Sequence, residues 1–338
     1  MIPRIQISAN GPECSRLVYG TWRILAEPRP TAQELNRRLQ VCLELGLTTI
    51  DTAEIYGGYE VEEALGRALK LSPGLRDKLE IVTKCGIYHP CARHPEWRTA
   101  HYNATADRIL KSVENSLRLL GTDRVELLLI HRPDWLTSAD ETADGLNRLL
   151  RAGKIRSAGV SNYTVSQFAL LNSRLTQPLA TNQIEFHLLH MDPMYDGTLD
   201  QCQQQRVSPM AWSPLAGGRL FDPQNEAAVL LHKCAEVLSP RYGNATLEQF
   251  AYAWLMASSE PPVANRGYKQ HRAHPPRRAG MRDHAGTSGL VCALGSSPGA
   301  ADSVNTPTGG GHDALCDVGL VNGRGDSVAV GRHKTVDG

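Results

Sequence analysis

Residues 125–134 read V-E-L-L-L-I-H-R-P-D, and this stretch indicates the fold class. Its first six residues form a short run that is largely apolar on both faces, which is typical of a parallel strand covered by helices. The run ends at His131, where such a strand would end. Similar runs alternate with amphipathic stretches from about residue 16 to residue 257. The pattern therefore predicts an α/β protein built on a parallel sheet.

The number of β/α repeats decides which parallel architecture is formed. About seven repeats are readable. An eighth would close a (β/α)8 barrel, or TIM barrel, whereas six or seven would suit an open doubly wound sheet. Periodicity alone leaves both possibilities open. The predicted strands cover residues 17–19, 47–50, 79–83, 125–130, 156–160, 180–184 and 208–211.

The boundaries of several helices can be predicted from local chemistry. Four hydroxyl residues stand three positions before a glutamate or glutamine, the spacing of a capping box, in which each side chain satisfies a free backbone N–H. Three glycines follow helical stretches and predict their C-terminal ends. The predicted N-caps are Thr31, Ser138, Thr164 and Thr246, and the predicted stops are Gly46, Gly121 and Gly153.

Composition and charge exclude several classes of protein. The chain has 338 residues, of which 41% are hydrophobic, and a formal net charge of +1, so nothing predicts binding to nucleic acid or to a membrane surface. No run is long enough to span a bilayer, and the first 13 residues do not resemble a signal peptide. We therefore expect a cytoplasmic protein. The eight cysteines form no C-x-x-C pair, and no metal site is predicted.

Polar side chains follow the predicted strands at the point where each strand ends. In a β/α barrel the carboxyl ends of all strands face one mouth, which is where catalysis takes place. The pattern therefore gathers these side chains around a single opening. They are Asp51, Tyr56, Lys84, His131, Ser161, Asn162, Gln183 and Trp212.

These residue types make a chemically sensible group. A tyrosine has a pKa of about 10 and is a poor acid at neutral pH, but a nearby lysine favours the phenolate and an aspartate can hold that lysine. The tyrosine then becomes a usable proton donor, and a neutral histidine can polarise a carbonyl. A hydride is still needed, and because no side chain supplies one, a nicotinamide cofactor is implied. Ser161, Asn162 and Gln183 could grip its carboxamide, and Trp212 offers a face for stacking.

Each residue taken alone also has an ordinary structural interpretation. Lys84 could be a solvated charge, Asn162 a left-handed turn residue and Trp212 a core side chain. The joint occurrence of all of them, in order and at strand ends, favours the catalytic interpretation. Cys85 could be a redox-sensitive thiol, but we predict a small buried hydrophobic residue.

The motifs resemble those of the aldo-keto reductase family. The resemblance rests on D-T-A-E-I-Y-G (51–57), V-T-K-C-G (82–86), L-L-I-H-R-P-D (128–134), G-V-S-N (159–162), T-N-Q (181–183) and W-S-P-L (212–215). It covers residues 1–257. Among bacterial members the chain looks most like a branch of oxidoreductases with G-x-W-R near residue 20. The resemblance implies a (β/α)8 barrel without a Rossmann motif.

The resemblance also implies a role for each matching residue. Tyr56 would be the general acid, Lys84 and Asp51 its tuning pair, and His131 the residue that orients the carbonyl. NADP(H) would be the cofactor. Its binding residues would be Asp51, Ser161, Asn162 and Gln183, the stacking Trp212, the loop residues Ser213, Pro214, Leu215, Gly217 and Gly218, and the pocket residues Gly20, Thr21 and Trp22.

The chain changes character after residue 261. Residues 262–338 contain no Ile, Phe, Trp or Glu, and glycine, proline and histidine are dense. Such a composition buries too little apolar surface to offset chain entropy. We therefore predict a barrel over residues 1–261 and a disordered tail over residues 262–338. The eighth β/α unit, with its strand and its phosphate-holding helix, is expected to be missing, which predicts weak cofactor binding and low stability.

A frameshift near Pro262 would explain this change. When the possible codons of residues 263–270 are read from their second base, the genetic code permits L-P-I-V-G-T-N-N, the family's expected eighth strand and phosphate loop. Residues 288–299 likewise permit a plausible amphipathic helix. The G-R-G-D-S sequence at 323–327 is then a chance match to an integrin-binding peptide.

The sequence therefore predicts NAD(P)H-dependent reduction of aldehydes or ketones, acting on a small-molecule carbonyl substrate. One alternative is a cofactor-binding regulatory subunit that resembles the potassium-channel β subunits, and another is an inactive frameshifted relic. The physiological substrate, the preference for NADPH over NADH and the oligomeric state are not predicted.

Overall fold

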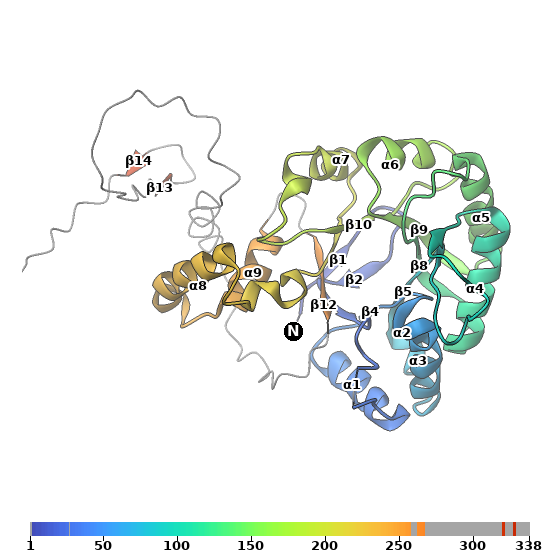
Figure 1. Cartoon of the computed structure of the whole chain (residues 1–338), viewed down its shortest axis with the longest axis horizontal. Helices are drawn as coiled ribbons and strands as arrows, with labels where there is room; N and C mark the ends of the chain where they lie inside the picture. The colour runs from blue at the N-terminus through green and yellow to red at the C-terminus, as the bar shows by residue number, and fades with distance from the viewer. Residues whose placement is uncertain (1, 27, 258–261, 268–319, 322–326, 329–338) are drawn as a thin grey trace, which may run out of the picture.

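The computed structural model describes residues 2–26, 28–257, 262–267, 320–321 and 327–328. Its central feature is a closed barrel of eight parallel strands with helices around it, which confirms the predicted TIM barrel (Figure 1). In order around the barrel the strands are β3 (Leu17–Gly20), β4 (Thr49–Asp51), β5 (Glu80–Cys85), β8 (Val125–Ile130), β9 (Ile155–Ser161), β10 (Asn182–Glu185), β11 (Met210–Trp212) and β12 (Val263–Gly267).

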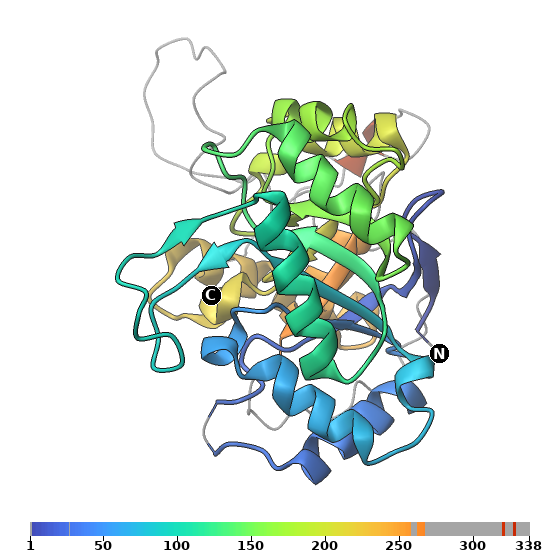
Figure 2. The same ribbon diagram turned by 90° about the vertical axis from the view of Figure 1, so that its right-hand side faces the viewer.

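Helices follow the strands along the chain and cover the outside of the barrel, as Figures 1 and 2 show. The four predicted N-caps each accept a hydrogen bond from the backbone N–H three residues later. The predicted stops Gly46, Gly121 and Gly153 all have positive φ angles, which glycine adopts without strain. The main helices are α1 (Ala32–Glu44), α3 (Val61–Lys70), α4 (Ala106–Leu120), α5 (Ala139–Arg151), α6 (Val165–Asn172), α7 (Thr198–Gln205), α8 (Glu226–Leu238) and α9 (Leu247–Met256).

The prediction that the eighth strand is missing is wrong. Strand β12 pairs in parallel with β11 on one side and with β3 on the other, so no barrel edge is left open and the barrel extends to Gly267. Val263 and Ala264 are fully buried, and their N–H groups donate to Pro209 O and Arg16 O. V-A-N-R-G has a weak strand propensity, so the sequence by itself does not predict this strand. The strand forms because β11 and β3 pair with it.

The remaining predictions about the C-terminal part concern residues beyond Gly267. Two short strands, β13 (Leu320–Val321) and β14 (Ser327–Val328), pair antiparallel. The eighth helix, the expected disorder and most of the G-R-G-D-S sequence lie outside the described residues.

Side chains that alternate along the strands divide the core into two layers. Val82 of β5, with Leu127 and Leu129 of β8, packs inside the barrel, while Leu128 and Ile130 pack against the outer helices. The same alternation aims Lys84 and His131 inward, at the carboxyl end of the barrel. The sequence pattern thus places two titratable groups directly above an apolar interior.

The other end of the barrel is closed by a hairpin. Strands β1 (Arg4–Gln6) and β2 (Glu13–Ser15) pair antiparallel, and Ile7 and Cys14 are fully buried against the barrel interior. The Ser208 N–H donates to Ile7 O at 2.7 Å and ties the hairpin to the chain that enters β11. Within the described residues, no helix is long and apolar enough to cross a membrane.

Candidate active site

The four predicted catalytic residues come together at the carboxyl ends of β4, β5 and β8. The Lys84 ammonium donates to Asp51 Oδ2 at 2.8 Å, to the Tyr56 hydroxyl at 3.0 Å and to the Thr52 carbonyl at 2.8 Å. Lys84 and Asp51 are almost fully buried. All three ammonium protons are therefore used, and one of them fixes the phenol. We call Asp51, Tyr56, Lys84 and His131 the tetrad.

The charges around the phenol act in opposite directions. Burial raises the pKa of Tyr56, and the Lys84 cation counteracts that rise without reversing it. Burial would lower the pKa of Lys84, but Asp51 and Tyr56 outweigh it, so the Lys84 pKa is raised. The expectation that lysine brings the tyrosine pKa below its ordinary value is therefore not met. The phenol is neutral and still carries the proton that it would donate.

His131 is a neutral imidazole in this setting. Burial lowers its pKa well below the ordinary value, and the nearby cations Lys84 and Arg132 lower it further. Its ring meets that of Tyr56 edge to face, with centroids 6.0 Å apart. Its Nδ1 is buried and has no hydrogen-bond partner among the described residues. A neutral histidine can hydrogen-bond a carbonyl oxygen without carrying charge into the site.

A sharp turn directs the Tyr56 side chain. Gly57 and Gly58, directly after it, both have positive φ angles, at 58° and 64°. A Cβ added at Gly57 would lie 2.9 Å from Val61 Cγ2, too close without a shift of that side chain. Tyr59 is also left-handed, with φ at 69°, and its hydroxyl donates to Ile87 O at 2.9 Å. The chain is therefore held directly after the turn.

Three of the predicted carboxamide-binding residues form a second group beside the tetrad. The Asn162 amide donates to Ser161 Oγ at 2.7 Å, and that hydroxyl donates to Gln183 O at 3.0 Å. Gln183 Nε2 donates to Asp51 Oδ1 at 2.9 Å and so joins the two groups. Asn162 has φ at 59°, so it is also the left-handed residue of the structural alternative. We call Ser161, Asn162, Gln183 and Trp212 the amide cluster.

Trp212 is half-buried at the end of β11, and Asn162 fixes its orientation. Its indole N–H donates to Asn162 Oδ1 at 2.9 Å. The Arg132 guanidinium lies over its ring, 5.9 Å from the centroid. The predicted loop after it turns tightly, with positive φ angles at Ser213, Gly217 and Gly218, while Pro214 is buried and Leu215 half-buried.

The predicted pocket residues at the end of β3 are placed differently from one another. Gly20 is buried and Thr21 fully so, and the Thr21 hydroxyl donates to Asp51 O at 2.9 Å. Trp22 is 57% exposed and packs with the Arg23 guanidinium. Arg23 reaches Gly217 O at 3.5 Å, so the β3 end and the loop after β11 lie side by side.

Sequence reasoning missed two groups near the tetrad. The first is the backbone carbonyl of Thr52, which holds Lys84 and gives no side-chain signal. The second is Glu54, buried and ion-paired with Arg108 at 2.8 Å. The signal that could have pointed to Glu54 is its position in D-T-A-E-I-Y, just after a predicted strand and two residues before Tyr56. Cys85 is buried, as predicted.

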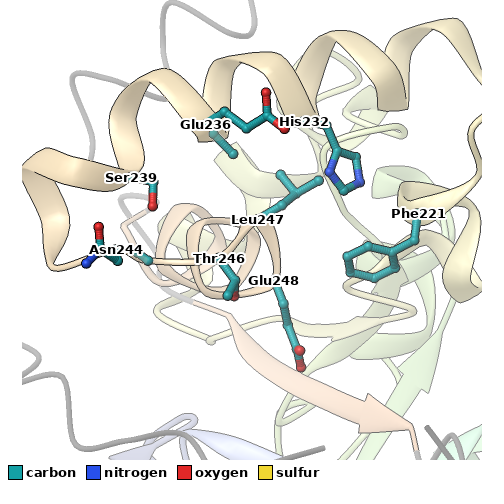
Figure 3. Close-up of a pocket in the computed structure, with 10 residues that line it drawn as sticks. Phe221, His232, Glu236, Ser239, Asn244, Thr246, Leu247 and Glu248 are labelled. Atoms are coloured by element: carbon teal, nitrogen blue, oxygen red, sulfur yellow. The ribbon is translucent and has the colours of Figure 1, made fainter.

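A hollow of about 420 Å³ lies elsewhere, between α8, α9 and the turns beside them (Figure 3). Phe221, His232, Glu236 and Thr246 are among the residues that line it. No residue of the tetrad or of the amide cluster is among them. The hollow is therefore separate from the candidate active site.

The chain belongs to the aldo/keto reductase family. The model of that family matches residues 16–271, most of the chain, including every member of the tetrad and of the amide cluster. The match runs through β12, in agreement with the closed barrel.

Two curated relatives are similar over most of their length. The chain is 47% identical to "Oxidoreductase YdhF" of Escherichia coli over 263 residues, 78% of this chain and 87% of the relative. It is 52% identical to a "6-dehydroglucose reductase" of Agrobacterium fabrum over 209 residues, 62% of this chain and 70% of the relative.

Solved structures share the fold. The thermostable aldo-keto reductase Tm1743, in complex with the inhibitor epalrestat, is 30% identical with a TM-score of 0.66, covering 80% of this chain and 90% of that one. The glycerol dehydrogenase AKR11B4 from Gluconobacter oxydans is 27% identical, also at 0.66, covering 78% and 86%. Together these findings support oxidoreductase chemistry on carbonyl groups, in a family that generally binds nicotinamide cofactors.

Proposed function

We propose that this protein reduces the carbonyl group of small aldehydes or ketones to an alcohol, with NADP(H) as the source of the hydride. The observation that carries the proposal is the buried Lys84, which bonds Asp51 and Tyr56 at once beside a neutral His131. A structural lysine needs one carboxylate, and its third bond to a half-buried phenol has no evident structural purpose.

The tetrad divides the proton chemistry among its members. His131 hydrogen-bonds the substrate carbonyl oxygen and orients it toward Tyr56. Tyr56 gives its hydroxyl proton to that oxygen as negative charge develops there, and the Lys84 cation stabilises the phenolate that remains. Asp51 keeps Lys84 charged and in place. No acceptor for the phenolic proton lies among the described residues, so the proton is available to the substrate.

The amide cluster fits a nicotinamide. Trp212 offers a half-buried ring held by Asn162, and Asn162 in turn bonds Ser161. Gln183 bonds the same Asp51 carboxylate that holds Lys84. These residues would hold the ring, Gly20, Thr21 and Trp22 would line the pocket beside it, and the loop from Ser213 to Gly218 would lie near the pyrophosphate. When bound, the reduced cofactor supplies the hydride that the tetrad lacks.

The test is NADPH oxidation measured with a panel of aldehydes and ketones that includes sugar aldehydes, as the relative's name suggests. Tyr56→Phe keeps the ring and removes the proton, so we expect kcat to fall by about 10²- to 10⁴-fold with little change in stability. Tyr195→Phe, which alters an exposed phenol outside the tetrad and the amide cluster, is the matched control. Unchanged turnover in Tyr56→Phe would contradict the proposed role, and a wild type that turns over no carbonyl would favour the regulatory or relic alternatives.

The proposal extends to the C-terminal part and the setting of the protein. We propose that it works in the cytoplasm, and that a frameshift near Pro262 produced the aberrant sequence that follows, the first residues of which still pair as β12. The nucleotide sequence around that codon tests the frameshift: the hypothesis fails if resequencing confirms this frame and a working copy shows no compensating insertion or deletion. NADPH titration of this chain beside one translated from the restored frame then measures what the altered tail costs, with weaker binding expected here.

A further inference from the structure

A buried carboxylate that the proposed reaction does not use lies two residues before Tyr56. Glu54 is 6% exposed, and its Oε1 accepts from Arg108 Nη2 at 2.8 Å and from the Gly86 N–H at 2.9 Å. Burying an ion pair is costly, and apolar side chains of the same size often stabilise a fold as well. The pair therefore invites a functional explanation.

The two donors to Glu54 stand at the two ends of one excursion of the chain. We call residues 86–103 the arm; its strands β6 (Ile87–Tyr88) and β7 (His101–Tyr102) pair antiparallel and project from the barrel (Figure 2). Gly86 begins the arm, and its carbonyl accepts from the Asn103 N–H at 2.9 Å. Arg108 lies in the first turns of α4, just after the arm. Glu54 thus ties both ends of the arm to the segment that carries Tyr56.

The arm carries a cluster of aromatic rings next to the point where Glu54 holds it. The Tyr88 ring stacks on His101, with centroids 4.5 Å apart, and meets Trp97 edge to face at 4.6 Å. The Arg108 guanidinium lies over Tyr88, 4.3 Å from the ring centroid. Arg108 therefore has two partners, one on each side: the carboxylate of Glu54 and the first aromatic ring of the arm.

A second attachment lies on the other side of Tyr56. The Tyr59 hydroxyl donates to Ile87 O at 2.9 Å and accepts from the His89 N–H at 3.1 Å. The arm is therefore fastened to the tyrosine segment both before and after Tyr56. Since the arm begins two residues after Lys84, at the end of β5, it stands at the mouth where the substrate must enter.

We propose that Glu54 is a positioning residue: with Arg108 it holds the arm beside Tyr56, so that the arm's aromatic rings bind the bulky part of a carbonyl substrate. The inference rests on the proposed carbonyl reduction. Loosening the pair weakens the hold on large substrates and leaves proton donation by Tyr56 in place. Small substrates, which do not reach the arm, are reduced as before.

The experiment compares benzaldehyde with biphenyl-4-carbaldehyde, which share a reacting group and differ in length. The variants are Arg108→Met, Arg108→Lys, Glu54→Gln and the double variant Glu54→Gln with Arg108→Met. The double variant removes both buried charges, so it can fold without leaving one of them unpaired. We expect Arg108→Met to raise KM for the biphenyl aldehyde about tenfold, with kcat for benzaldehyde changed less than threefold. Lysine keeps the charge but not the flat stacking surface, so Arg108→Lys should recover part of the loss.

The matched control is an ion pair at the opposite end of the barrel. Arg76 and Glu126 lie 3.0 Å apart with side chains 14% and 16% exposed, near the start of β8. Arg76→Met should lower the Tm about as much as Arg108→Met does, and it should leave the ratio of the KM values for the two aldehydes unchanged. If Arg108→Met behaves in the same way, the Glu54–Arg108 pair is structural only and the inference is wrong.

A second measurement does not depend on turnover. Hydrogen exchange of the amides in the arm should be at least tenfold faster in Glu54→Gln than in the wild type, because the Gly86 N–H and Arg108 lose a charged acceptor. Unchanged exchange overturns the inference. If the wild type reduces neither aldehyde, the proposed function fails, while the exchange result still decides whether Glu54 fixes the arm.

Discussion

The tetrad and the amide cluster lie at the same mouth, but they use their polar atoms in different ways. In the tetrad, the phenolic proton of Tyr56 and the Nδ1 of His131 have no partner among the described residues. In the amide cluster, the side chains of Asn162 and Gln183 bond to neighbours on the protein. The tetrad therefore has polar atoms left over for a substrate, whereas these side chains of the amide cluster are already paired within the protein.

The link between the two groups is the buried Asp51. One carboxylate oxygen accepts from Lys84 and the other accepts from Gln183. Two donors from strands that are not neighbours, β5 and β10, thus share one anion, and a change in either group reaches the other through it. Breaking each side separately shows how much of the site depends on this link.

The largest effect is expected from Lys84→Met, which breaks the tetrad side. Methionine has a similar length but no charge, so Asp51 is left buried without its cation. Removing one partner of a buried pair costs about 3–5 kcal/mol, and the Tyr56 phenolate loses its stabilising charge. We expect a Tm at least several degrees lower and loss of measurable turnover. Lys70→Met, on the outer surface of α3, is the control, and a Lys84→Met protein with wild-type Tm would show that Asp51 is compensated in another way.

The residues of the tetrad could be predicted because several rules agree on them. Lys84 and His131 follow from the alternation along β5 and β8 and from the rule that barrel chemistry sits at carboxyl ends. Asp51 directly follows a predicted strand in the same way, and Tyr56 comes just after it in the D-T-A-E-I-Y-G motif. Each rule is local, and each can be read from a few consecutive residues.

The parts that were missed depend on contacts between distant segments. Strand β12 forms because β11 and β3 leave one position in the barrel, and Val263 and Ala264 fill it although the residues around them predict no strand. Glu54 resembles a solvated turn residue until Arg108, far along the chain, is brought to it. Asn162 satisfied both interpretations, since it is left-handed and also holds Trp212.

A smaller effect is expected on the side of the amide cluster, from substitutions at Asn162. Asn162→Gly tolerates the positive φ and removes only the amide, so Trp212 loses its hydrogen bond while the backbone keeps its conformation. We expect NADPH affinity, measured by fluorescence titration, to fall about 3- to 10-fold, with a small change in Tm. Asn162→Ala should lower affinity similarly and also destabilise the fold by about 1 kcal/mol, because alanine does not favour this φ. Equal affinity for Asn162→Gly and wild type would show that Trp212 is oriented without Asn162.

The last expected effect is a change in how stability depends on pH, and it concerns His131, the member of the tetrad whose ordinary pKa lies nearest to neutrality. Its pKa is depressed in the folded protein by burial and by two nearby cations, whereas in the unfolded chain it is about 6.5. Below pH 6.5 the unfolded state therefore binds a proton that the folded state refuses, and folding stability falls as the pH drops. One such group contributes at most about 1.4 kcal/mol for each pH unit until the folded pKa is reached.

The stability of His131→Asn, followed by urea unfolding between pH 7 and pH 5, should fall less steeply than that of the wild type. His187 is also buried with a lowered pKa and stays in both proteins, so the difference between the two slopes isolates His131. Parallel slopes would mean that His131 takes up its proton in the folded state, and the neutral hydrogen-bonding role would then have to be abandoned.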